Sequence, residues 1–351
     1  MPSVVHVVTT GNFAGVERYV CDAGRETSAR GWQTAVVGGS ADRMPAALGG
    51  DVRWLPGATP LEAVRSLRRI GRQDICHAHM TTAEAVSIVA KPLHRAPIVS
   101  TRHFAGSRGA NRAGKLLAPR IGRRLARQIA VSDFVAQQLE RAPDAVIRNG
   151  VPPSPCLWRG SSRVVLVVQR LEREKDTMTA LRAWRASRLA DEGWSMRVVG
   201  AGSERTALEA WVASEHVPGV TFAGATARVS DEFASAGVLL APAPAEPFGL
   251  VVVEAMAAGV PVVACAAGGH LETVGLLREA AMFAPRDIVA AVTVLHSYRS
   301  DDTRAAASEA GRQLVSTRFS ITHHIDQLLV EYDTARDRTE RRVVRAGASV
   351  S

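Results

Sequence analysis

The sequence has few cysteines and few aromatic residues, and it contains no long uninterrupted run of apolar residues. Four cysteines occur, they lie far apart and they form no paired motif: Cys21, Cys76, Cys156 and Cys265. This pattern argues against a disulfide framework and against a cysteine-based metal site. No run of eighteen apolar residues is present, and no basic region followed by a long apolar core opens the chain. We therefore expect a cytoplasmic protein without a membrane-spanning helix or a signal peptide.

Lysine is also scarce, and most of the positive charge comes from arginine. The formal net charge is +9, and arginines concentrate at 65–72, at 102–127 and after residue 334. Such stretches indicate an anionic partner, either a nucleoside diphosphate, an anionic lipid headgroup or a nucleic acid. Because they contain few aromatic residues that would stack on bases, we do not expect a nucleic-acid partner. Frequent arginine from a GC-rich genome is the alternative explanation.

The rest of the sequence is an alternation of strand-like and helical segments. Its 351 residues suffice for two domains, and 46% of them are apolar. The alternation predicts parallel sheets that are covered by helices on both faces. Turn residues and prolines at 148–155 interrupt it in the middle of the chain. We therefore expect two doubly wound, Rossmann-like α/β domains, at 1–152 and 153–320.

The most informative motif lies between Glu246 and Glu254. A proline follows Glu246 and disfavours helix there, whereas the segment after Gly249 predicts a short buried helix. Glu246 is then a loop residue, and Glu254 lies about one and a half turns inside the helix. The free amides at the helix start, a natural anion site, belong to Phe248, Gly249 and Leu250. A sugar nucleotide fits this layout, with hydroxyls at the two carboxylates and a diphosphate at the amides.

This segment resembles the Glu-x7-Glu signature of the retaining family 4 glycosyltransferases, which have the GT-B fold with two domains facing a central cleft. The resemblance implies that Glu246 lies at the transferred sugar and that Glu254 binds the ribose hydroxyls. It implies transfer from a nucleoside diphosphate sugar to a hydroxyl acceptor, with retention of configuration and without a metal or other cofactor. It also implies that a helix at 321–335 crosses back to the first domain. The polar tail at 336–351 is expected to be disordered.

Arg170 and Lys175 match the two cations that hold the donor diphosphate in the family. The family pattern is Gly-Arg-Leu followed four residues later by Lys-Gly. Cations at this position stabilise the charge that accumulates on the leaving diphosphate. Gln169 and Asp176 replace the two glycines of the pattern, which questions the conformation of the loop more than its charge.

Further segments match positions that line the donor in the family. Gly200 and Gly202 resemble a Gly-x-Gly near the nucleotide, although a tight turn from strand to helix explains them equally well. Val229 lies where the family usually holds the base. Gly15 belongs to a glycine-rich loop, in which Ala14 departs from the family pattern.

Three histidines and one glutamate need a separate interpretation. His103 ends a predicted strand and matches a histidine that hydrogen-bonds the transferred sugar in the family. His77 and His79 alternate on one strand, but no carboxylate or cysteine companion is apparent in the sequence, so we expect no metal there. Glu17 is expected to complement the dipole of the helix that follows Gly15.

Two other classes of function remain open. Sugar-nucleotide 2-epimerases share the GT-B architecture and turn over a donor without an acceptor. A non-enzymatic module that binds anions or a membrane surface would explain the basic stretches but would leave Glu246 and Glu254 without a role. Glycoside hydrolysis is not expected, because it needs both carboxylates at one scissile bond. The stretch 102–127 is expected to face either an anionic membrane with a lipid-linked acceptor or a soluble glycan or natural-product acceptor.

Overall fold

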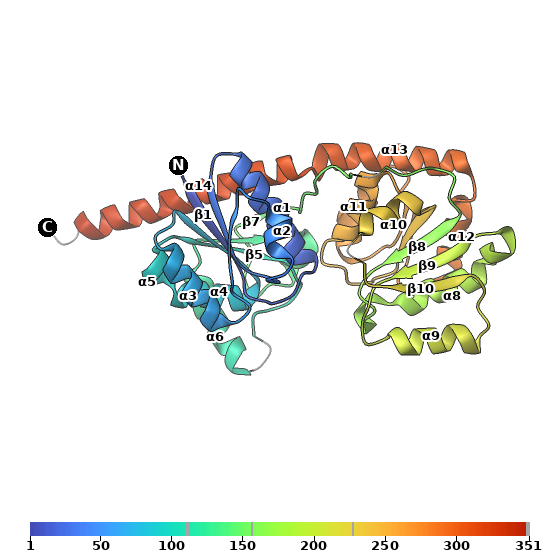
Figure 1. The fold of residues 1–351 in the computed structure, drawn as a ribbon, viewed down its shortest axis with the longest axis horizontal. Coiled ribbons are helices and arrows are strands. Elements are labelled where there is room, and N and C mark those ends of the chain that lie inside the picture. The colour runs from blue at the N-terminus through green and yellow to red at the C-terminus, as the bar shows by residue number, and fades with distance from the viewer. Residues whose placement is uncertain (110–111, 156, 227, 349–351) are drawn as a thin grey trace. The chain divides into compact units, whose positions relative to one another are not determined.

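The computed structural model describes residues 1–109, 112–155, 157–226 and 228–348, with the backbone alone for 112–117 and 340–348. The chain forms two compact α/β domains, coloured along the chain in Figure 1. Residues 1–152 and 321–351 form the N-terminal domain, and residues 153–320 form the C-terminal domain. Among the described residues, no helix is both long enough and apolar enough to cross a bilayer.

The N-terminal domain is built on a seven-stranded parallel sheet with the strand order β3-β2-β1-β4-β5-β6-β7. Its strands are β1 (Ser3–Val8), β2 (Gln33–Gly38), β3 (Arg53–Leu55), β4 (Ile75–His79), β5 (Ile98–Arg102), β6 (Arg127–Ala130) and β7 (Ala145–Val146). Its helices are α1 (Gly15–Ala29), α2 (Met44–Leu48), α3 (Pro60–Ile70), α4 (Met80–Val89), α5 (Lys91–His94), α6 (Arg112–Arg124), α7 (Asp133–Gln137) and α14 (Ile321–Ala348). The central strands β1 and β4 are buried along almost their whole length, as expected for strands covered on both faces.

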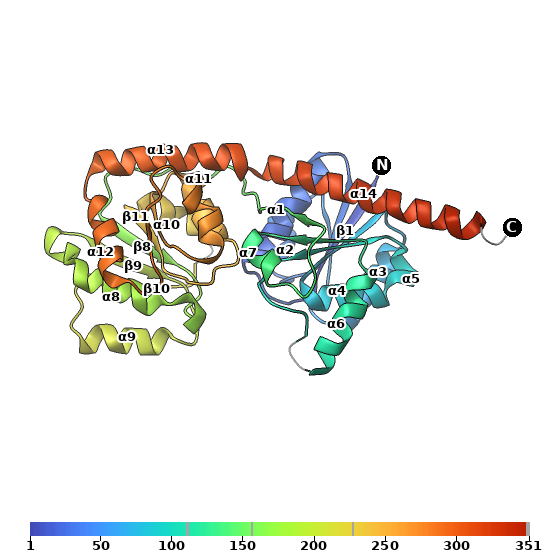
Figure 2. The same ribbon diagram turned by 180° about the vertical axis from the view of Figure 1, so that it is seen from behind.

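Two separate apolar cores lie on the two faces of this sheet. One core joins the sheet to α1, α2 and α14. The other joins it to α3, α4 and α5 and includes Leu125, which directly follows α6. The helices α3, α4, α5 and α6 therefore form one outer layer, which Figure 2 shows on one side of the sheet.

Helix α14 belongs to the N-terminal domain although it is the last element of the chain. Its inward side chains recur at helical spacing and are buried in the first core: Ile321, Ile325, Leu328, Tyr332 and Ala335. The helix continues to Ala348, so the sequence prediction of a helix end at 335 and a disordered tail at 336–351 is wrong for 336–348. The added residues contain no proline and only one glycine, and arginine, glutamate and alanine favour helix.

The C-terminal domain contains a six-stranded parallel sheet with the order β10-β9-β8-β11-β12-β13. Its strands are β8 (Val164–Val168), β9 (Ser195–Val199), β10 (Val220–Gly224), β11 (Val238–Ala241), β12 (Val262–Cys265) and β13 (Met282–Phe283). Its α-helices are α8 (Thr177–Ser187), α9 (Arg205–Ser214), α10 (Val229–Ser235), α11 (Leu250–Ala258), α12 (Ile288–Ser297) and α13 (Asp301–Arg318). Short 3-10 helices are η1 (Arg173–Lys175), η2 (Leu189–Glu192), η3 (Gly268–Glu272) and η4 (Val274–Leu276).

Candidate functional site

An ion pair between Lys175 and Glu246 joins two loops of the C-terminal domain. Lys175 lies after β8, and Glu246 lies after β11, the neighbouring strand of the sheet. The Nζ atom of Lys175 is 2.6 Å from Oε2 of Glu246, and the two side chains are only 15% and 21% exposed. Because neighbouring parallel strands end at the same edge, two residues that are 71 positions apart in sequence meet there.

The loop that carries Lys175 is stabilised by the two residues that depart from the family pattern. The side-chain amide of Gln169 donates to the carbonyl of Lys175 at 3.0 Å and to Oγ1 of Thr177 at 2.8 Å. Asp176 has a left-handed backbone, with φ of 49°, a conformation that Asp adopts more readily than most residues. Its carboxylate accepts a hydrogen bond from Thr179 at 2.8 Å. Gln169 and Asp176 therefore form an ordered loop at the positions where the family pattern has glycines.

Gly200 and Gly202 pack against the backbone of this same loop. A Cβ atom on Gly200 would lie 1.8 Å from the carbonyl oxygen of Gln169, and one on Gly202 would lie 2.3 Å from that of Leu171. Gly200 also has a φ of 148°, which side chains rarely allow. Close backbone packing therefore accounts for both glycines, in agreement with the tight-turn explanation.

Arg170 is paired with Glu174 and not with Glu246. Their side-chain atoms are 2.7 Å apart, and both side chains are more than half exposed. An exposed ion pair of this kind contributes little stability. Its arginine can therefore exchange Glu174 for another anion at small energetic cost.

The segment that contains the two glutamates has the predicted loop-to-helix geometry. Gly249 has a φ of 89° and precedes α11, which ends at Gly259 in another left-handed turn. Helix geometry leaves the first amides of α11 without intrahelical partners, as expected for an anion site. Phe248 is buried, its ring packs against that of Phe319, and Gly269 lies close to its backbone. Glu254 lies on the second turn of α11 and is partly buried.

His270 is a site residue that the sequence analysis missed. It lies in η3 and is buried, and a Cβ atom on Gly249 would be 3.0 Å from its ring. Burial lowers the pKa of His270, although the negative charge of Glu246 opposes this, so the ring is neutral near pH 7. The preceding Gly268-Gly269 pair could have indicated it. A Cβ atom on Gly268 would lie 2.7 Å from the carbonyl oxygen of Glu246. This close approach brings His270, which follows the two glycines, next to the loop that carries Glu246.

Val229 is the first residue of α10, and its side chain is partly buried. It lies in the C-terminal domain, after β10, the edge strand of the sheet. No contact that would define a base pocket involves Val229, among the described residues, so its role stays a prediction.

In the N-terminal domain, Gly15 and Glu17 have different roles at the start of α1. A Cβ atom on Gly15 would meet nothing within 4 Å, so packing inside the domain does not require a glycine there. Glu17 is buried and accepts hydrogen bonds from the amide of Ala14 at 2.8 Å and from Oγ1 of Thr10 at 3.2 Å. Glu17 therefore ties the preceding loop to the first turn of α1, a structural role.

His103 is the last member of a buried chain of three imidazoles. The Nδ1 atom of His6 is 3.0 Å from Nε2 of His79, and Nδ1 of His79 is 3.1 Å from Nε2 of His103. Burial lowers the pKa of His6 and His103 to about 3 and that of His79 well below its usual value, so all three rings are neutral near pH 7. A neutral imidazole has one donor and one acceptor nitrogen, so the two hydrogen bonds that join these rings must both be donated in the same direction.

The other nitrogen of His6 determines that direction. Nε2 of His6 is buried and has no hydrogen-bond partner among the described residues. If the chain ran from His103 to His6, this nitrogen would carry a buried, unpaired N–H group, which is rare in proteins. In the favoured arrangement, His6 donates a hydrogen bond to His79, and His79 donates one to His103. Nε2 of His103 is then an acceptor, so His103 carries its proton on Nδ1.

His6, His77 and His79 also satisfy the distance requirement for a shared cation, since one nitrogen of each lies within 4.8 Å of the others. However, both nitrogens of His77 are already engaged, by Tyr332 at 2.7 Å and by Thr101 at 2.8 Å. A cation would have to break these contacts and the bond between His6 and His79. Hydrogen bonding therefore explains the cluster as it stands.

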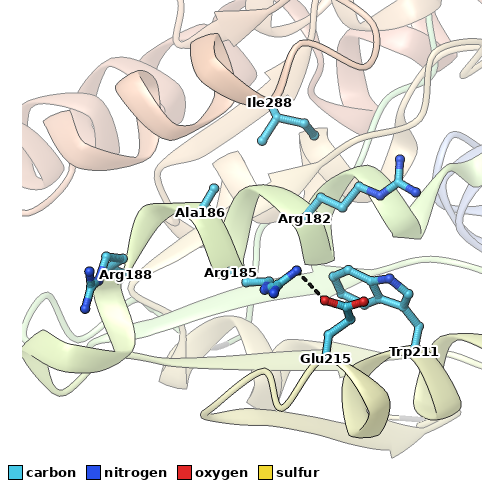
Figure 3. A pocket seen from close by; sticks show the side chains of 7 residues that line it. All are labelled: Arg182, Arg185, Ala186, Arg188, Trp211, Glu215 and Ile288. Atoms are coloured by element: carbon cyan, nitrogen blue, oxygen red, sulfur yellow. Dashed lines mark ion pairs between the residues drawn. The ribbon is translucent and has the colours of Figure 1, made fainter.

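A hollow of about 650 Å³ lies elsewhere on the C-terminal domain, beside α8, α9 and α12. Figure 3 shows the residues that line it: Arg182, Arg185, Ala186, Arg188, Trp211, Glu215 and Ile288. The charge of Arg185 is balanced by Glu215 at 2.6 Å, and that of Arg188 by Asp191 at 3.0 Å. Neither Lys175 nor Glu246 is among the residues that line the hollow. This hollow is therefore separate from the ion pair of Lys175 and Glu246.

Two family models match successive parts of the chain. The model described as "Glycosyltransferase Family 4" matches residues 13–154, and the model described as "Glycosyl transferases group 1" matches residues 156–314. Together they span most of both domains.

Individual relatives and solved structures agree with these models. A 2-deoxystreptamine glucosyltransferase from Streptomyces kanamyceticus is 31% identical over 48% of this chain, but the match spans only 45% of that protein. A glycogen synthase from Mycobacterium tuberculosis is 27% identical over 75% of this chain and 70% of its own length. The crystal structure of Anabaena HepE in complex with UDP-glucose is 20% identical, with a TM-score of 0.77 over 93% of this chain and 99% of that one. This structural likeness shows the GT-B fold, with two Rossmann-like domains.

Proposed function

Because the chain belongs to the family 4 glycosyltransferases, we propose that it transfers a sugar from a nucleoside diphosphate sugar to a hydroxyl acceptor with retention of configuration. The observation that carries this proposal is the partly buried pair of Lys175 and Glu246 beside the start of α11. It combines a cation, a carboxylate and free helix amides within one domain. These are the groups that a diphosphate and a sugar hydroxyl require.

In the proposed mechanism, Lys175 and Arg170 stabilise the negative charge that develops on the leaving diphosphate. Arg170 would leave Glu174 for the diphosphate, and Lys175 would share its charge between Glu246 and the diphosphate. The amides of Phe248, Gly249 and Leu250 would bind the same anion at the N-terminal end of α11. Fixed donors that face a developing charge lower the barrier without reorganising during the reaction.

Glu246 would then hold the transferred sugar through its hydroxyl groups, and Glu254 would hold the ribose. His270 supports this arrangement from below, because its neutral ring packs against Gly249 and adds no competing positive charge. His103 would donate a hydrogen bond from Nδ1 to a sugar hydroxyl, as the direction of the imidazole chain favours. Gly15 would leave room for the donor or acceptor, since no packing contact fills its side-chain position. We propose no metal or other cofactor for this chemistry.

A uridine diphosphate sugar is the first donor to test, because the crystal structure of Anabaena HepE contains UDP-glucose. The decisive measurement is donor binding and turnover in two glutamate variants. We expect Glu254→Ala to weaken binding of the donor at least tenfold, equivalent to about 1.4 kcal/mol. We expect Glu246→Gln to keep most of the binding but to lower kcat by about 100-fold or more.

A matched control is Glu209→Gln, which removes a carboxylate from an exposed pair with Arg205 on α9. It should change neither donor binding nor kcat. If Glu254→Ala binds every nucleotide sugar as the native protein does, the proposed role of Glu254 is wrong. The anomeric configuration of the product, measured by proton NMR, tests retention directly.

A sugar-nucleotide 2-epimerase is the second candidate, supported by the shared GT-B fold. It would convert or release the donor at the same rate with and without an acceptor. The transferase would instead form a glycoside and would turn over the donor much faster when a hydroxyl acceptor is present.

A further inference from the structure

The positive charge of the chain is concentrated in residues 60–124. This segment contains thirteen lysines and arginines but only three aspartates and glutamates. The rest of the chain contains thirty basic and thirty-one acidic residues and is therefore almost neutral. A genome-wide preference for arginine would raise the arginine content everywhere and would not produce this local excess of charge.

The structure separates the arginines of this region into a buried group and an exposed group. Arg108 is buried and pairs with Glu84 and Glu140, and Arg102 is buried next to Glu140. The neighbouring Arg127 is nearly buried against Glu331 and Asp144. These three arginines stabilise the fold, so the prediction that the whole stretch 102–127 faces a partner is wrong for them. Their burial beside carboxylates was not visible in the sequence.

The exposed arginines lie on the outer helical layer of the N-terminal domain. Arg65, Arg68 and Arg69 lie on α3, and Arg72 follows it. Arg95 follows α5, and the last three lie on α6: Arg120, Arg123 and Arg124. None of these eight forms an ion pair with another residue that the structure describes. Because α3, α5 and the end of α6 lie on the same side of the sheet (Figure 2), one helical layer of the domain carries all eight unpaired charges.

Exposed apolar side chains accompany these charges. Leu61 is 60% exposed and lies at the start of α3, and Val89 is 71% exposed at the end of α4. On α3, the helical period puts Leu61 on the same stripe as Arg65 and Arg68, and Arg72 follows the helix. An unpaired basic stripe that begins with an exposed leucine fits a lipid interface, where headgroups bind arginine and acyl chains accept apolar side chains. Arginines alone would also bind nucleic-acid phosphates, but the exposed Leu61 and Val89 find apolar partners in a lipid bilayer and not along a phosphate backbone.

We propose that this basic face, formed by the eight arginines with Leu61 and Val89, docks the N-terminal domain on an anionic lipid bilayer. Charge complementarity carries the interaction, because each arginine near an anionic surface strengthens binding about fivefold. Docking does not depend on the proposed sugar transfer.

The test is co-sedimentation of the full chain with vesicles that contain phosphatidylglycerol and phosphatidylcholine, compared with vesicles of phosphatidylcholine alone. We expect binding to the anionic vesicles only, with a strong decrease at high salt. The variant with Arg65, Arg68, Arg69 and Arg72 all replaced by glutamine should bind at least 100-fold more weakly. A circular-dichroism melt confirms that this variant is folded.

The matched control replaces four exposed arginines of the C-terminal domain with glutamine: Arg159, Arg182, Arg278 and Arg318. It lowers the net charge by the same amount and should retain vesicle binding within a few-fold. The proposal is overturned if the control loses as much binding as the α3 variant or if the native chain ignores anionic vesicles. Tighter binding to duplex DNA or RNA at the same salt concentration would also overturn it. Donor binding by the α3 variant is measured in parallel and should be unchanged, so failure of membrane docking and failure of the proposed sugar transfer are distinguishable.

Discussion

The two domains have the same type of parallel sheet but place their polar groups differently. In the N-terminal domain, polar side chains such as His6 and His77 lie on the central strands themselves and are fully buried. In the C-terminal domain, the strands are mostly apolar inside, and Lys175 and Glu246 lie on the loops that follow them. Both arrangements present chemistry at the carboxyl edge of a sheet, but they stabilise it in different ways.

The difference shows how each domain maintains a precise polar geometry. Buried imidazoles are fixed by mutual hydrogen bonds and exclude water, which makes their geometry depend on every ring being neutral. The loops of the C-terminal domain are fixed by glycines at close backbone contacts, and their charged side chains, Lys175 and Glu246, stay partly exposed. We expect the first arrangement to be sensitive to pH and the second to be sensitive to side-chain volume.

The largest expected effect is selective loss of the N-terminal domain in mild acid. Burial lowers the pKa of His6 and His103 to about 3 and that of His324 to about 4, from an ordinary value of 6.5. The unfolded chain then binds more protons than the folded one, so stability is complete above pH 6.5 and falls as the pH decreases. At pH 5 each of these rings lowers the free energy of unfolding by about 2 kcal/mol relative to neutral pH. The three losses together approach the total stability of a domain.

Hydrogen exchange followed by mass spectrometry measures this for each domain separately. Between pH 7 and pH 5, peptides from β1 and β4 should lose protection, whereas peptides from β8 and β9 should change less, after correction for the intrinsic exchange rate. Equal losses in both domains, or full protection of β1 at pH 4.5, would contradict the prediction.

The next effect in size concerns two glycines, one from each domain. Gly200→Ala should destabilise the C-terminal domain by about 2–4 kcal/mol, because the new Cβ atom would collide with the backbone of Gln169 at an unfavourable φ. Gly15→Ala should leave the stability unchanged or raise it by up to about 1 kcal/mol, since its site is open and helical. Thermal melts give both values. A decrease in turnover without a decrease in stability for Gly15→Ala would support a role for Gly15 in ligand approach.

The smallest expected effect concerns the loop that carries Lys175. Asp176→Gly removes the hydrogen bond to Thr179 but relieves the left-handed backbone, so we expect a change within about 1 kcal/mol and an active protein. Asp176→Ala cannot relieve the backbone and should be about 1 kcal/mol less stable than Asp176→Gly. Urea titration of the two variants measures the difference. Equal stabilities would mean that the backbone conformation at Asp176 has no energetic cost.

The alternation of apolar strands and helices in the sequence predicts both domains, because each parallel strand is buried on both faces and is joined to the next by a helical connection. The predicted loop at Glu246 and the helix after Gly249 are also present, since proline and glycine act locally. Contacts between distant segments could not be predicted in this way. The ion pair of Lys175 with Glu246 and the burial of Arg108 against Glu84 depend on the order of the strands, which the spacing of residues does not encode. The hydrogen-bonded histidines also come from distant segments: His6 lies on β1, His79 on β4, and His103 directly follows β5. Only His77 and His79, which share β4, are close enough in sequence to be noticed as a pair.

The contact between His77 and Tyr332 has a consequence for how the chain folds during synthesis. Tyr332 lies on α14, and its hydroxyl group reaches His77 from 255 residues further along the chain. The N-terminal domain therefore leaves the ribosome first but lacks one wall of its core until the last helix is made. At ordinary translation rates this interval is on the order of 10–30 s, during which the C-terminal domain can already form. The domain that begins the chain is the one whose core is completed last.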